Sequence, residues 1–401
     1  MTKNDDKRIP ALRFKGFNDD WAQRKLKNLV SFSKGKGYTK NDLLSNGTPI
    51  LLYGMLYTNY LERYSNFFTY AKANLKSVYS TKHEVVMPDS GETSVDIARA
   101  SWVDKPGVIL GGGLIILKPK DIIFPGFLAY SLTYGKNHKD IASKAQGKSV
   151  VHIHSKDLAN LKFFFPKNIV TQRKICNLLE EVNTYISLQQ RKLKQYQLIK
   201  KWLCSVVFND TVHDDANILF SNRVKANQLF ESISKKGFKD LPVLSASQEK
   251  GMVFRDDISK NITYTNSNLN NYKLVSPGNF VVHLRSFQGG FSYSNKIGIA
   301  SPAYTIFEFK DNIKYDSIFW KEKFKSYNFI QLLKKVTYGV RDGRSISFSD
   351  FLSLYLTFPD IEIQKKIGKC FKALDNQISD QQCIIQQLKQ LKQFLLQNMF
   401  I

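Results

Sequence analysis

One long amphipathic pattern occurs twice in this chain, and this duplication constrains the fold more than any other feature. The first copy covers residues 171–208 and the second covers residues 363–400. Aligning Gln172 with Gln364 gives an offset of 192 residues, which holds to the end of both copies without a gap. Because each copy ends a larger stretch of chain, we expect two half-molecules in tandem.

Apolar residues within each copy alternate at spacings of four and three, which is the heptad pattern of a coiled coil. A helix over residues 171–208 would be about 57 Å long, since each residue adds about 1.5 Å. The pattern predicts two long helices that form an antiparallel coiled coil, and the duplication suggests a pseudo-two-fold relation between them. The expected seam residues are Ile175, Leu179, Val182, Ile186, Gln189, Leu193, Tyr196 and Leu203, followed by Ile367, Phe371, Leu374, Ile378, Gln381, Ile385, Leu388 and Leu395.

Two polar residues interrupt the apolar seam at matching places in both copies. Gln189 corresponds to Gln381, and Lys200 corresponds to Lys392. A polar seam residue costs stability but penalises wrong alignments, so these residues are candidates for setting the register. The alternative for the lysines is a solvated place at the rim of the seam.

The repeat extends into the segments that flank the helices. Residues 161–165 and 354–358 are each expected to form a short strand that a proline ends before the helix. The interiors of the halves differ almost completely and are rich in short β-branched and aromatic runs, with a helical stretch over residues 318–333. We therefore expect an α+β fold, divided into a globular domain 1–166, a central helix 167–208, a second globular domain 209–359 and a C-terminal helix 360–401.

The charge of the chain points to a polyanionic partner. There are 59 Lys and Arg residues against 34 Asp and Glu residues, a formal net charge of +25. Such an excess favours nucleic acid as the partner, although a Lys-rich composition can also arise from the composition of a genome. Lys and Arg contact phosphates, whereas Arg and Gln also read guanine and adenine edges.

Basic, polar and aromatic residues interleave in several expected loops of both halves. For any single residue among them, a solvated surface charge is the alternative reading. The candidate DNA-contacting residues are Lys34, Lys36, Lys40, Lys144, Gln146 and Lys148 in the first half, and Lys235, Lys236, Ser247, Gln248, Arg285, Gln288, Arg341 and Arg344 in the second.

The sequence shows no membrane segment and no secretory signal. No apolar run approaches the roughly 18 residues that span a bilayer, and the first ten residues are polar and charged. The four cysteines lie in the helical repeats without CxxC spacing, which is typical of a protein in a reducing compartment. We expect a cytoplasmic protein that does not contact a membrane.

Patterns typical of catalytic or metal sites are incomplete. Gly147-Lys148-Ser149 lacks the earlier glycine of a phosphate-binding loop, because position 142 is alanine. His152 and His154 correspond to serines in the second half, so no metal site is expected. The chain therefore looks like a recognition module without catalytic residues.

Several of these segments together resemble the specificity subunit of type I restriction-modification enzymes. They are residues 10–17 with the following Trp21, residues 240–248, and the Gln-Arg/Lys-Lys-Ile start of both long helices after a proline-ended strand. The resemblance covers the whole chain in organisation, while the individual motifs are loose.

The resemblance implies a DNA-recognition role in host defence. Each globular half would be a target-recognition domain reading one part of a bipartite, asymmetric site in double-stranded DNA. The helices would set the gap between the parts and dock two methyltransferase subunits. Restriction subunits, which are ATP-dependent translocases and nucleases, would join the complex. S-adenosylmethionine for DNA methylation and ATP would bind to those partners, so no cofactor is expected on this chain.

Three other functions remain open from the residues alone. A stand-alone DNA-binding regulator would bind its site tightly without a partner. An enzyme acting on nucleic acid through an unrecognised site would methylate or cleave DNA as an isolated chain. A coiled-coil adaptor would show no salt-dependent DNA binding.

Overall fold

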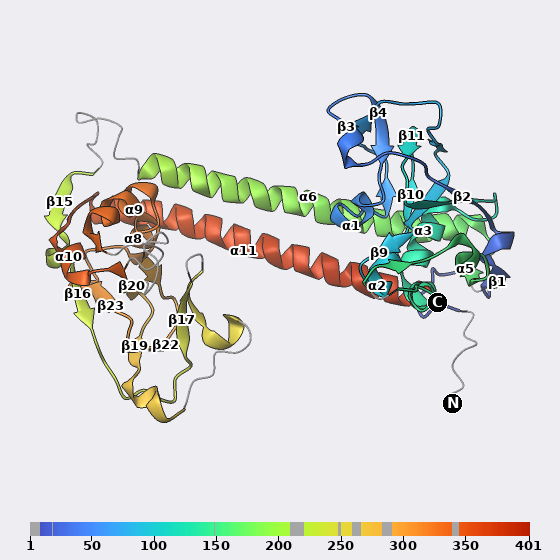
Figure 1. Cartoon of the computed structure of the whole chain (residues 1–401). Coiled ribbons are helices and arrows are strands. Elements are labelled where there is room, and N and C mark those ends of the chain that lie inside the picture. The colour runs from blue at the N-terminus through green and yellow to red at the C-terminus, as the bar shows by residue number, and fades with distance from the viewer. Residues whose placement is uncertain are drawn as a thin grey trace. The chain divides into compact units, whose positions relative to one another are not determined.

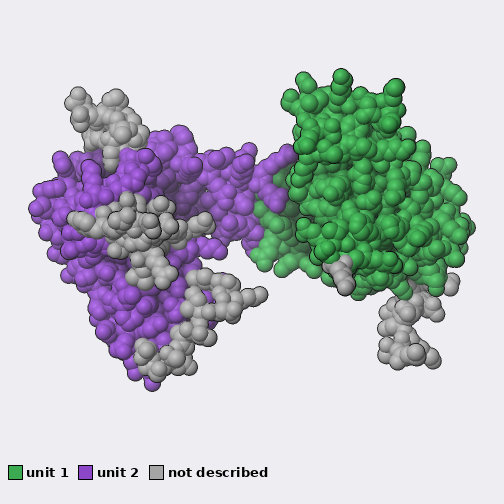
Figure 2. All heavy atoms as spheres, in the orientation of Figure 1, with its two compact units in different colours: residues 1–189, 384–401 green, residues 190–383 purple. Residues whose placement is uncertain are grey.

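The computed structural model describes residues 9–17, 19–147, 149–208, 220–247, 250–258, 266–282, 291–338 and 345–401. The chain divides into two compact units (Figure 2). Unit 1 comprises Met1–Gln189 with Ile384–Ile401, and unit 2 comprises Gln190–Cys383. Both divisions fall inside long helices, so each of these helices contributes one half to each unit.

The two long helices are α6 (Ile169–Val207) and α11 (Ile361–Asn398), which begin and end within two residues of the predicted ranges (Figure 1). Within unit 2 they run antiparallel, because Lys200 contacts Asp375 while Phe208, just after α6, stacks on the earlier Phe371. None of the described helices combines the length and the apolar composition of a membrane span. Long helices beside mixed sheets confirm the predicted α+β class.

Two five-stranded sheets form the centre of unit 1. The first sheet has the order β2-β12-β8-β10-β5 and the second has the order β3-β6-β4-β11-β7. The strands of the first are β2 (Val30–Lys34), β12 (Leu114–Pro119), β8 (Glu84–Pro88), β10 (Ser101–Val103) and β5 (Arg63–Tyr64). Those of the second are β3 (Leu43–Leu44), β6 (Tyr70–Ala71), β4 (Thr48–Leu51), β11 (Pro106–Leu110) and β7 (Tyr79–Thr81).

Strand β8 is buried on both faces, which explains its unbroken apolar run. Val85 and Met87 point into the core beneath helix α3 (Pro125–Thr133), whereas Val86 joins the core that includes Leu110 of the second sheet. This division follows from the two-residue period of a strand.

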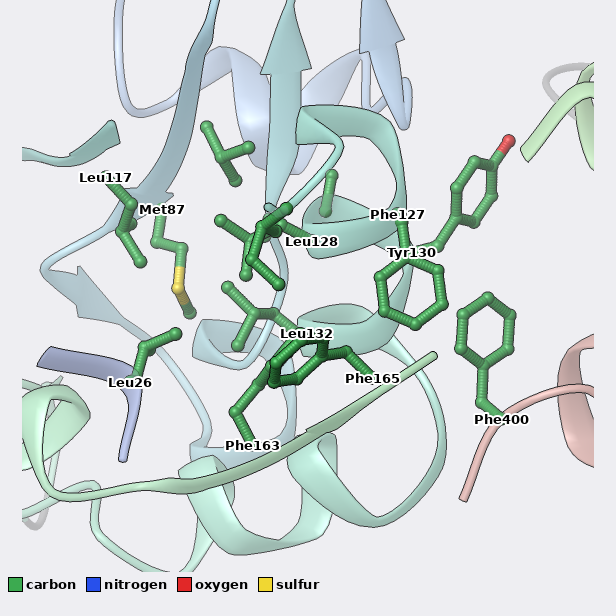
Figure 3. Close-up of a cluster of buried hydrophobic side chains, with 14 of the residues drawn as sticks. Leu26, Met87, Leu117, Phe127, Leu128, Tyr130, Leu132, Phe163, Phe165 and Phe400 are labelled. Carbon is green, nitrogen blue, oxygen red and sulfur yellow. The ribbon is translucent and has the colours of Figure 1, made fainter. Parts of the chain in front are cut away.

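The long helices complete the larger core of unit 1. Phe400, at the end of the chain, stacks on Phe127 of α3 with ring centroids 5.7 Å apart (Figure 3). Leu179 of α6 and Leu395 of α11 belong to the same buried cluster. The remaining elements of unit 1 are the strand pairs β1 (Ala22–Lys25) with β14 (Lys162–Phe165) and β9 (Ser90–Gly91) with β13 (Val151–His152), and helices α1 (Met55–Thr58), α2 (Ser94–Ile97), α4 (Gly135–Ala142) and α5 (Ser155–Ala159).

Unit 2 is built around a four-stranded antiparallel sheet of order β16-β23-β20-β21. Its strands are β16 (Phe230–Ile233), β23 (Ile306–Phe309), β20 (Phe280–Val282) and β21 (Phe291–Tyr293). The strand pairs are β15 (Asn222–Lys225) with β26 (Tyr355–Phe358), β17 (Leu244–Ser247) with β18 (Gly251–Phe254), β19 (Lys273–Val275) with β22 (Gly298–Ala300), and β24 (Thr337–Tyr338) with β25 (Ser345–Ile346).

Aromatic side chains fill the core of unit 2. Phe230 packs edge-on against Phe307 and Trp320, with ring centroids 5.5 and 5.4 Å apart. Edge-to-face packing suits the charge distribution of aromatic rings, so it adds to the gain from burial. The helices around this core are α7 (Ala226–Leu229), α8 (Ser317–Lys323), α9 (Tyr327–Leu333) and α10 (Phe348–Ser353).

Local expectations about strands and helices had different outcomes. The predicted strands before the long helices are present as β14 and β26, each paired antiparallel with the first strand of its unit. The expectation of one helical stretch over residues 318–333 was wrong. Two helices occur there, because the chain turns and the Ser326 side chain accepts a hydrogen bond from Phe329 N–H, capping α9.

Candidate nucleic-acid interface

The sixteen predicted seam residues all lie on the covered side of α6 and α11. Seven of them, including Ile175, Phe371 and Gln381, are buried, and the other nine are partly buried. Charged neighbours such as Lys192 and Lys194 are exposed. On each helix the seam positions therefore form one continuous covered stripe. This stripe contributes to the packing of both units.

A glutamine at the start of each long helix is fully inside its unit. Gln172 and Gln364 are 0% and 1% exposed. The Oε1 atom of Gln172 accepts from Phe124 N–H at 2.8 Å, and that of Gln364 accepts from Asp316 N–H at 3.1 Å. Each Nε2 donates to the carbonyl of the proline that ends the preceding strand, at 2.9 and 2.8 Å. Each glutamine therefore connects the preceding strand, the long helix and the globular part of its unit. In the sequence, only the repetition of this glutamine pointed to its importance.

The repeated lysines of the seam bind carboxylates rather than solvent. Lys392 Nζ lies 2.6 Å from Glu62 Oε1 in unit 1. Lys200 Nζ lies 2.6 Å from Asp375 Oδ1 and 3.1 Å from Glu322 Oε1 in unit 2. Burial raises the pKa of the Asp375 carboxyl, but hydrogen bonds from Lys200 and Lys321 lower it further, so that its pKa lies below the ordinary value. In each unit a lysine of the seam is therefore attached to a carboxylate.

A basic loop follows the first edge strand of unit 1. The predicted DNA-contacting residues Lys36 and Lys40 lie in this segment, Lys34 ends β2 just before it, and all three are exposed. The loop backbone lies against the turn at Gly111-Gly112-Gly113. Gly112 N–H donates to Gly37 O at 2.7 Å, and Lys36 N–H donates to Leu110 O at 3.2 Å. The three glycines form the turn between β11 and β12, and this turn positions the basic loop.

Replacing Gly35 with alanine is expected to force this basic loop away from the glycine turn. A Cβ atom at position 35 would lie 1.9 Å from Gly111 O, so the backbone must move. Overpacking of this kind costs about 2 kcal/mol. Hydrogen exchange of the Lys36 and Gly112 amides should become faster, because both donate across the contact. Gly54→Ala is the matched control, since nothing lies within 4 Å of its added Cβ. Equal protection of the Lys36 and Gly112 amides in both variants would contradict the expected contact between the loop and the glycine turn.

The same loop motif recurs in unit 2, where the domain interiors otherwise differ. Lys36-Gly37-Tyr38 follows edge strand β2, and Lys236-Gly237-Phe238 follows edge strand β16. Both central glycines have positive φ, 59° and 92°. Lys235 and Lys236 are exposed on this second loop. Each unit thus presents a basic loop with an aromatic residue at an equivalent place.

The remaining predicted contacts are spread over other segments. Lys144 and Gln146 are exposed in the turn after α4, where the Gln146 backbone bridges His152. Ser247 ends β17, is partly buried, and accepts a hydrogen bond at its carbonyl from Ser292. Six predicted residues lie outside the described residues, namely Lys148, Gln248, Arg285, Gln288, Arg341 and Arg344.

Two further lysines of unit 1 were not among the predicted contacts. Lys72 and Lys76 are exposed in the loop between β6 and β7. The Tyr38 hydroxyl of the first basic loop donates to Lys72 O at 3.1 Å, so the two loops are joined. No periodic pattern in the sequence connects these segments. Within the described ranges, no group of three or more His, Cys, Asp or Glu side chains is arranged to hold a metal ion.

Comparison with known proteins shows the family to which this chain belongs. Residues 18–197 and 221–390 match the family described as "Type I restriction modification DNA specificity domain". The search of curated protein sequences found no match. Among solved structures, the chain is similar to the S subunit of the type I restriction-modification system from M. genitalium, at 16% identity and a TM-score of 0.61, covering 98% of this chain and 99% of that chain.

A second similar structure comes from work on complex assembly and conformational transition of the type I R-M system. Its identity is 15%, its TM-score is 0.53, and the match covers 94% of this chain and 96% of that chain. At such identities the two matches show a shared fold.

Proposed function

Because this chain belongs to the family of type I restriction modification DNA specificity domains, we propose that its two units read the two parts of one bipartite DNA site. The chain is the DNA-recognition component of such a system and not its catalytic part. The observation that carries the proposal is the double family match, over residues 18–197 and 221–390. Neither a stand-alone regulator nor a nucleic-acid-modifying enzyme is favoured by this match.

We assign target recognition to residues 1–166 and 209–359, and the spacer role to residues 167–208 and 360–401. The two units share one strand order, β2-β12-β8-β10 in unit 1 and β16-β23-β20-β21 in unit 2. Unit 1 adds β5 and a second five-stranded sheet, whereas the other described strands of unit 2 form pairs, so the two half-sites should differ in sequence. B-DNA advances about 3.4 Å per base pair, so long helices can hold two readers on segments separated by unread pairs. Rigid spacing makes two weak recognitions act as one strong recognition through effective concentration.

The exposed basic residues supply the nonspecific part of DNA binding. Lysines such as Lys36 and Lys236, each on the loop after an edge strand, suit contacts to phosphate oxygens, which orient a protein on the duplex without reading bases. Release of counterions from these phosphates should make binding depend strongly on salt.

Two methyltransferase subunits are the proposed partners on the helices. Ile199 and Trp202 of α6 are 47% and 63% exposed, and their repeat equivalents Leu391 and Phe394 of α11 are 45% and 53% exposed. Large apolar side chains that remain exposed beside each other favour a protein contact. Since each pair occurs once per repeat, two copies of the same partner fit better than one.

The proposal extends to the other members of the complex. Restriction subunits would supply ATP-dependent translocation and cleavage, and S-adenosylmethionine would bind to the methyltransferases. The protein would work in the cytoplasm, where these partners meet DNA.

Methylome sequencing of cells that express this chain with its methyltransferase tests the proposal. We expect one asymmetric bipartite motif with a constant gap, which disappears when the gene for this chain is deleted. Removing residues 186–192 and 378–384 together deletes one heptad from each helix, keeps the seam in phase and should shift the gap or abolish methylation. A continuous motif, or the same gap in the shortened variant, would overturn the two-reader arrangement.

A further inference from the structure

Leu75 is the most exposed large apolar side chain of the described residues, with a relative exposure of 107%. It lies in the loop between β6 and β7, with Lys72 and Lys76 near it in sequence. Single exposed apolar residues are ordinary on protein surfaces, so exposure alone indicates nothing. What distinguishes Leu75 is the construction of the loop that presents it.

Hydrogen bonds hold this loop in one conformation. Asn74 N–H donates to Ser77 Oγ at 2.9 Å, and Lys76 N–H donates to Asn74 Oδ1 at 2.8 Å. The Tyr38 hydroxyl donates to Lys72 O, which uses its only hydrogen, so the 2.6 Å contact between Tyr38 and Ser77 must have the Ser77 hydroxyl as donor. Together these hydrogen bonds link Lys72 at the start of the loop, through the Tyr38 hydroxyl, to Ser77 at its end.

Tyr38 itself is fixed from the other side. It has a φ of 60°, a conformation that few non-glycine residues adopt. Its ring packs against the cluster of Ile50, Leu52 and Ile109. Strained backbone persists only where the surroundings hold it, and such strain gathers at binding sites. The loop at Leu75 is therefore supported by the core of the second sheet.

The segment that carries Leu75 contains basic but no acidic residues. Residues 65–83 contain Lys72, Lys76 and Lys82 but no Asp or Glu. Tyr38 also belongs to the basic loop with Lys36 and Lys40. The nearest acidic residue of that loop, Asp42, accepts hydrogen bonds from Thr39 N–H and Oγ1–H. A rigid apolar tip between lysines matches the apolar wedges with which proteins enter a base step while cations contact the neighbouring phosphates.

We propose that Leu75 is an apolar wedge that inserts between two adjacent base pairs in the half-site read by unit 1. Lys72 and Lys76 contact the phosphates on either side of that step, and Tyr38 is a positioning residue that keeps the wedge pointing outward. The inference rests on the proposed function, because it requires a DNA site for unit 1. Its consequence is local unstacking and bending of one half-site.

The experiment uses the complex of this chain with its methyltransferase and duplexes carrying the motif found by methylome sequencing. 2-Aminopurine replaces one purine at a time across the motif, because its fluorescence rises when stacking is lost. The wild-type complex should raise fluorescence at one step within one half-site. Leu75→Ala should lose this rise, while its Kd changes by less than about tenfold, because the unstacking cost disappears together with the contact.

Two further variants separate the parts of the proposal. Ile313→Ala is the control, since Ile313 is 87% exposed in unit 2, and it should leave the fluorescence rise unchanged. Lys72→Gln with Lys76→Gln should reduce the slope of log Kd against log salt by about 1.8, the value for two lost phosphate contacts. An unchanged slope would overturn the phosphate contacts.

The outcomes distinguish the wedge from the function on which it rests. No fluorescence rise at any position with the wild-type complex, or a rise that persists in Leu75→Ala, overturns the wedge while leaving bipartite recognition intact. Equal wild-type affinity for the motif and for a scrambled duplex overturns the proposed function, and the wedge falls with it.

Discussion

Replacing Lys392 with methionine should lower the free energy of unfolding of unit 1 by about 3 kcal/mol, because it leaves a buried carboxylate without its cation. The side chain of Glu62 is 10% exposed, and Lys392 Nζ lies 2.6 Å from its Oε1 atom. Methionine keeps most of the apolar stem of lysine, so the loss should be electrostatic rather than a packing defect. The Tyr134 hydroxyl, which donates to Glu62 at 2.8 Å, cannot replace the missing charge.

Hydrogen exchange is the suitable measurement, because a chain with two units need not unfold in one step. Amides of α3 and the end of α11 report on unit 1, and those of β16 and β23 report on unit 2, which should be unaffected. Adding Glu62→Gln to Lys392→Met should restore much of the loss, since the amide keeps a partner for Tyr134 without a buried charge. Lys389→Met, at an exposed position of the same helix, is the control. A loss no larger than that of the control would show that the ion pair does not stabilise unit 1.

The corresponding change in unit 2 should have a smaller effect. Lys200 shares its carboxylates with Lys321, whose Nζ lies 3.1 Å from Glu322 Oε1 and 2.5 Å from Asp375 Oδ2. After Lys200→Met, Glu322 and Asp375 would therefore still share Lys321. Lys200 and Lys392 occupy equivalent positions in the repeat, but the carboxylates that they bind differ between the units.

If the proposed methyltransferase subunits dock on the helices, loss of the exposed aromatic residues there should remove them from the complex. Trp202→Ser with Phe394→Ser is expected to abolish co-purification, and each single variant should leave one partner copy instead of two. Aromatic anchors at the centre of an interface typically contribute about 2–4 kcal/mol each, enough to weaken Kd by roughly 30- to 1,000-fold. Native mass spectrometry of the co-expressed complex counts the copies directly.

The exposure of these residues makes the test specific. Trp202 is 63% exposed and Phe394 is 53% exposed, so the variants should unfold at the same denaturant concentration as the unchanged chain. Ile313→Ser removes an exposed apolar side chain elsewhere and should retain both partner copies. Two retained copies in the double variant would show that the partners dock on another surface.

The local parts of the fold could be predicted from the residues. The heptad spacing from Ile175 to Leu203 predicts a helix, because the period of side chains around a helix is a local property. The strands before the long helices follow from short apolar runs that end at Pro166 and Pro359. The helical stretch after Asp316 was predicted as one piece, because the capping role of Ser326 depends on a turn that leaves little trace in composition.

Contacts between distant residues could not be predicted in the same way. Lys36 and Lys40 of the first basic loop were candidates from the sequence and are exposed, whereas the sequence did not single out the exposed Lys72 and Lys76. The hydroxyl of Tyr38 joins their loop to the first basic loop. The partner of Lys392 was also open, since Glu62 lies 330 residues away along the chain.

The sequence by itself determined the tandem organisation, the two long helices and the family, because repetition and periodicity are written in residue order. Only the tertiary structure decided that the seam lysines bind buried carboxylates, that Gln172 and Gln364 fasten the helices, and that Leu75 is held out between lysines. Each of these depends on which polar atoms meet after folding. Burial makes such pairing strongly favourable when complete and costly when a partner is missing, but it leaves no period in the sequence.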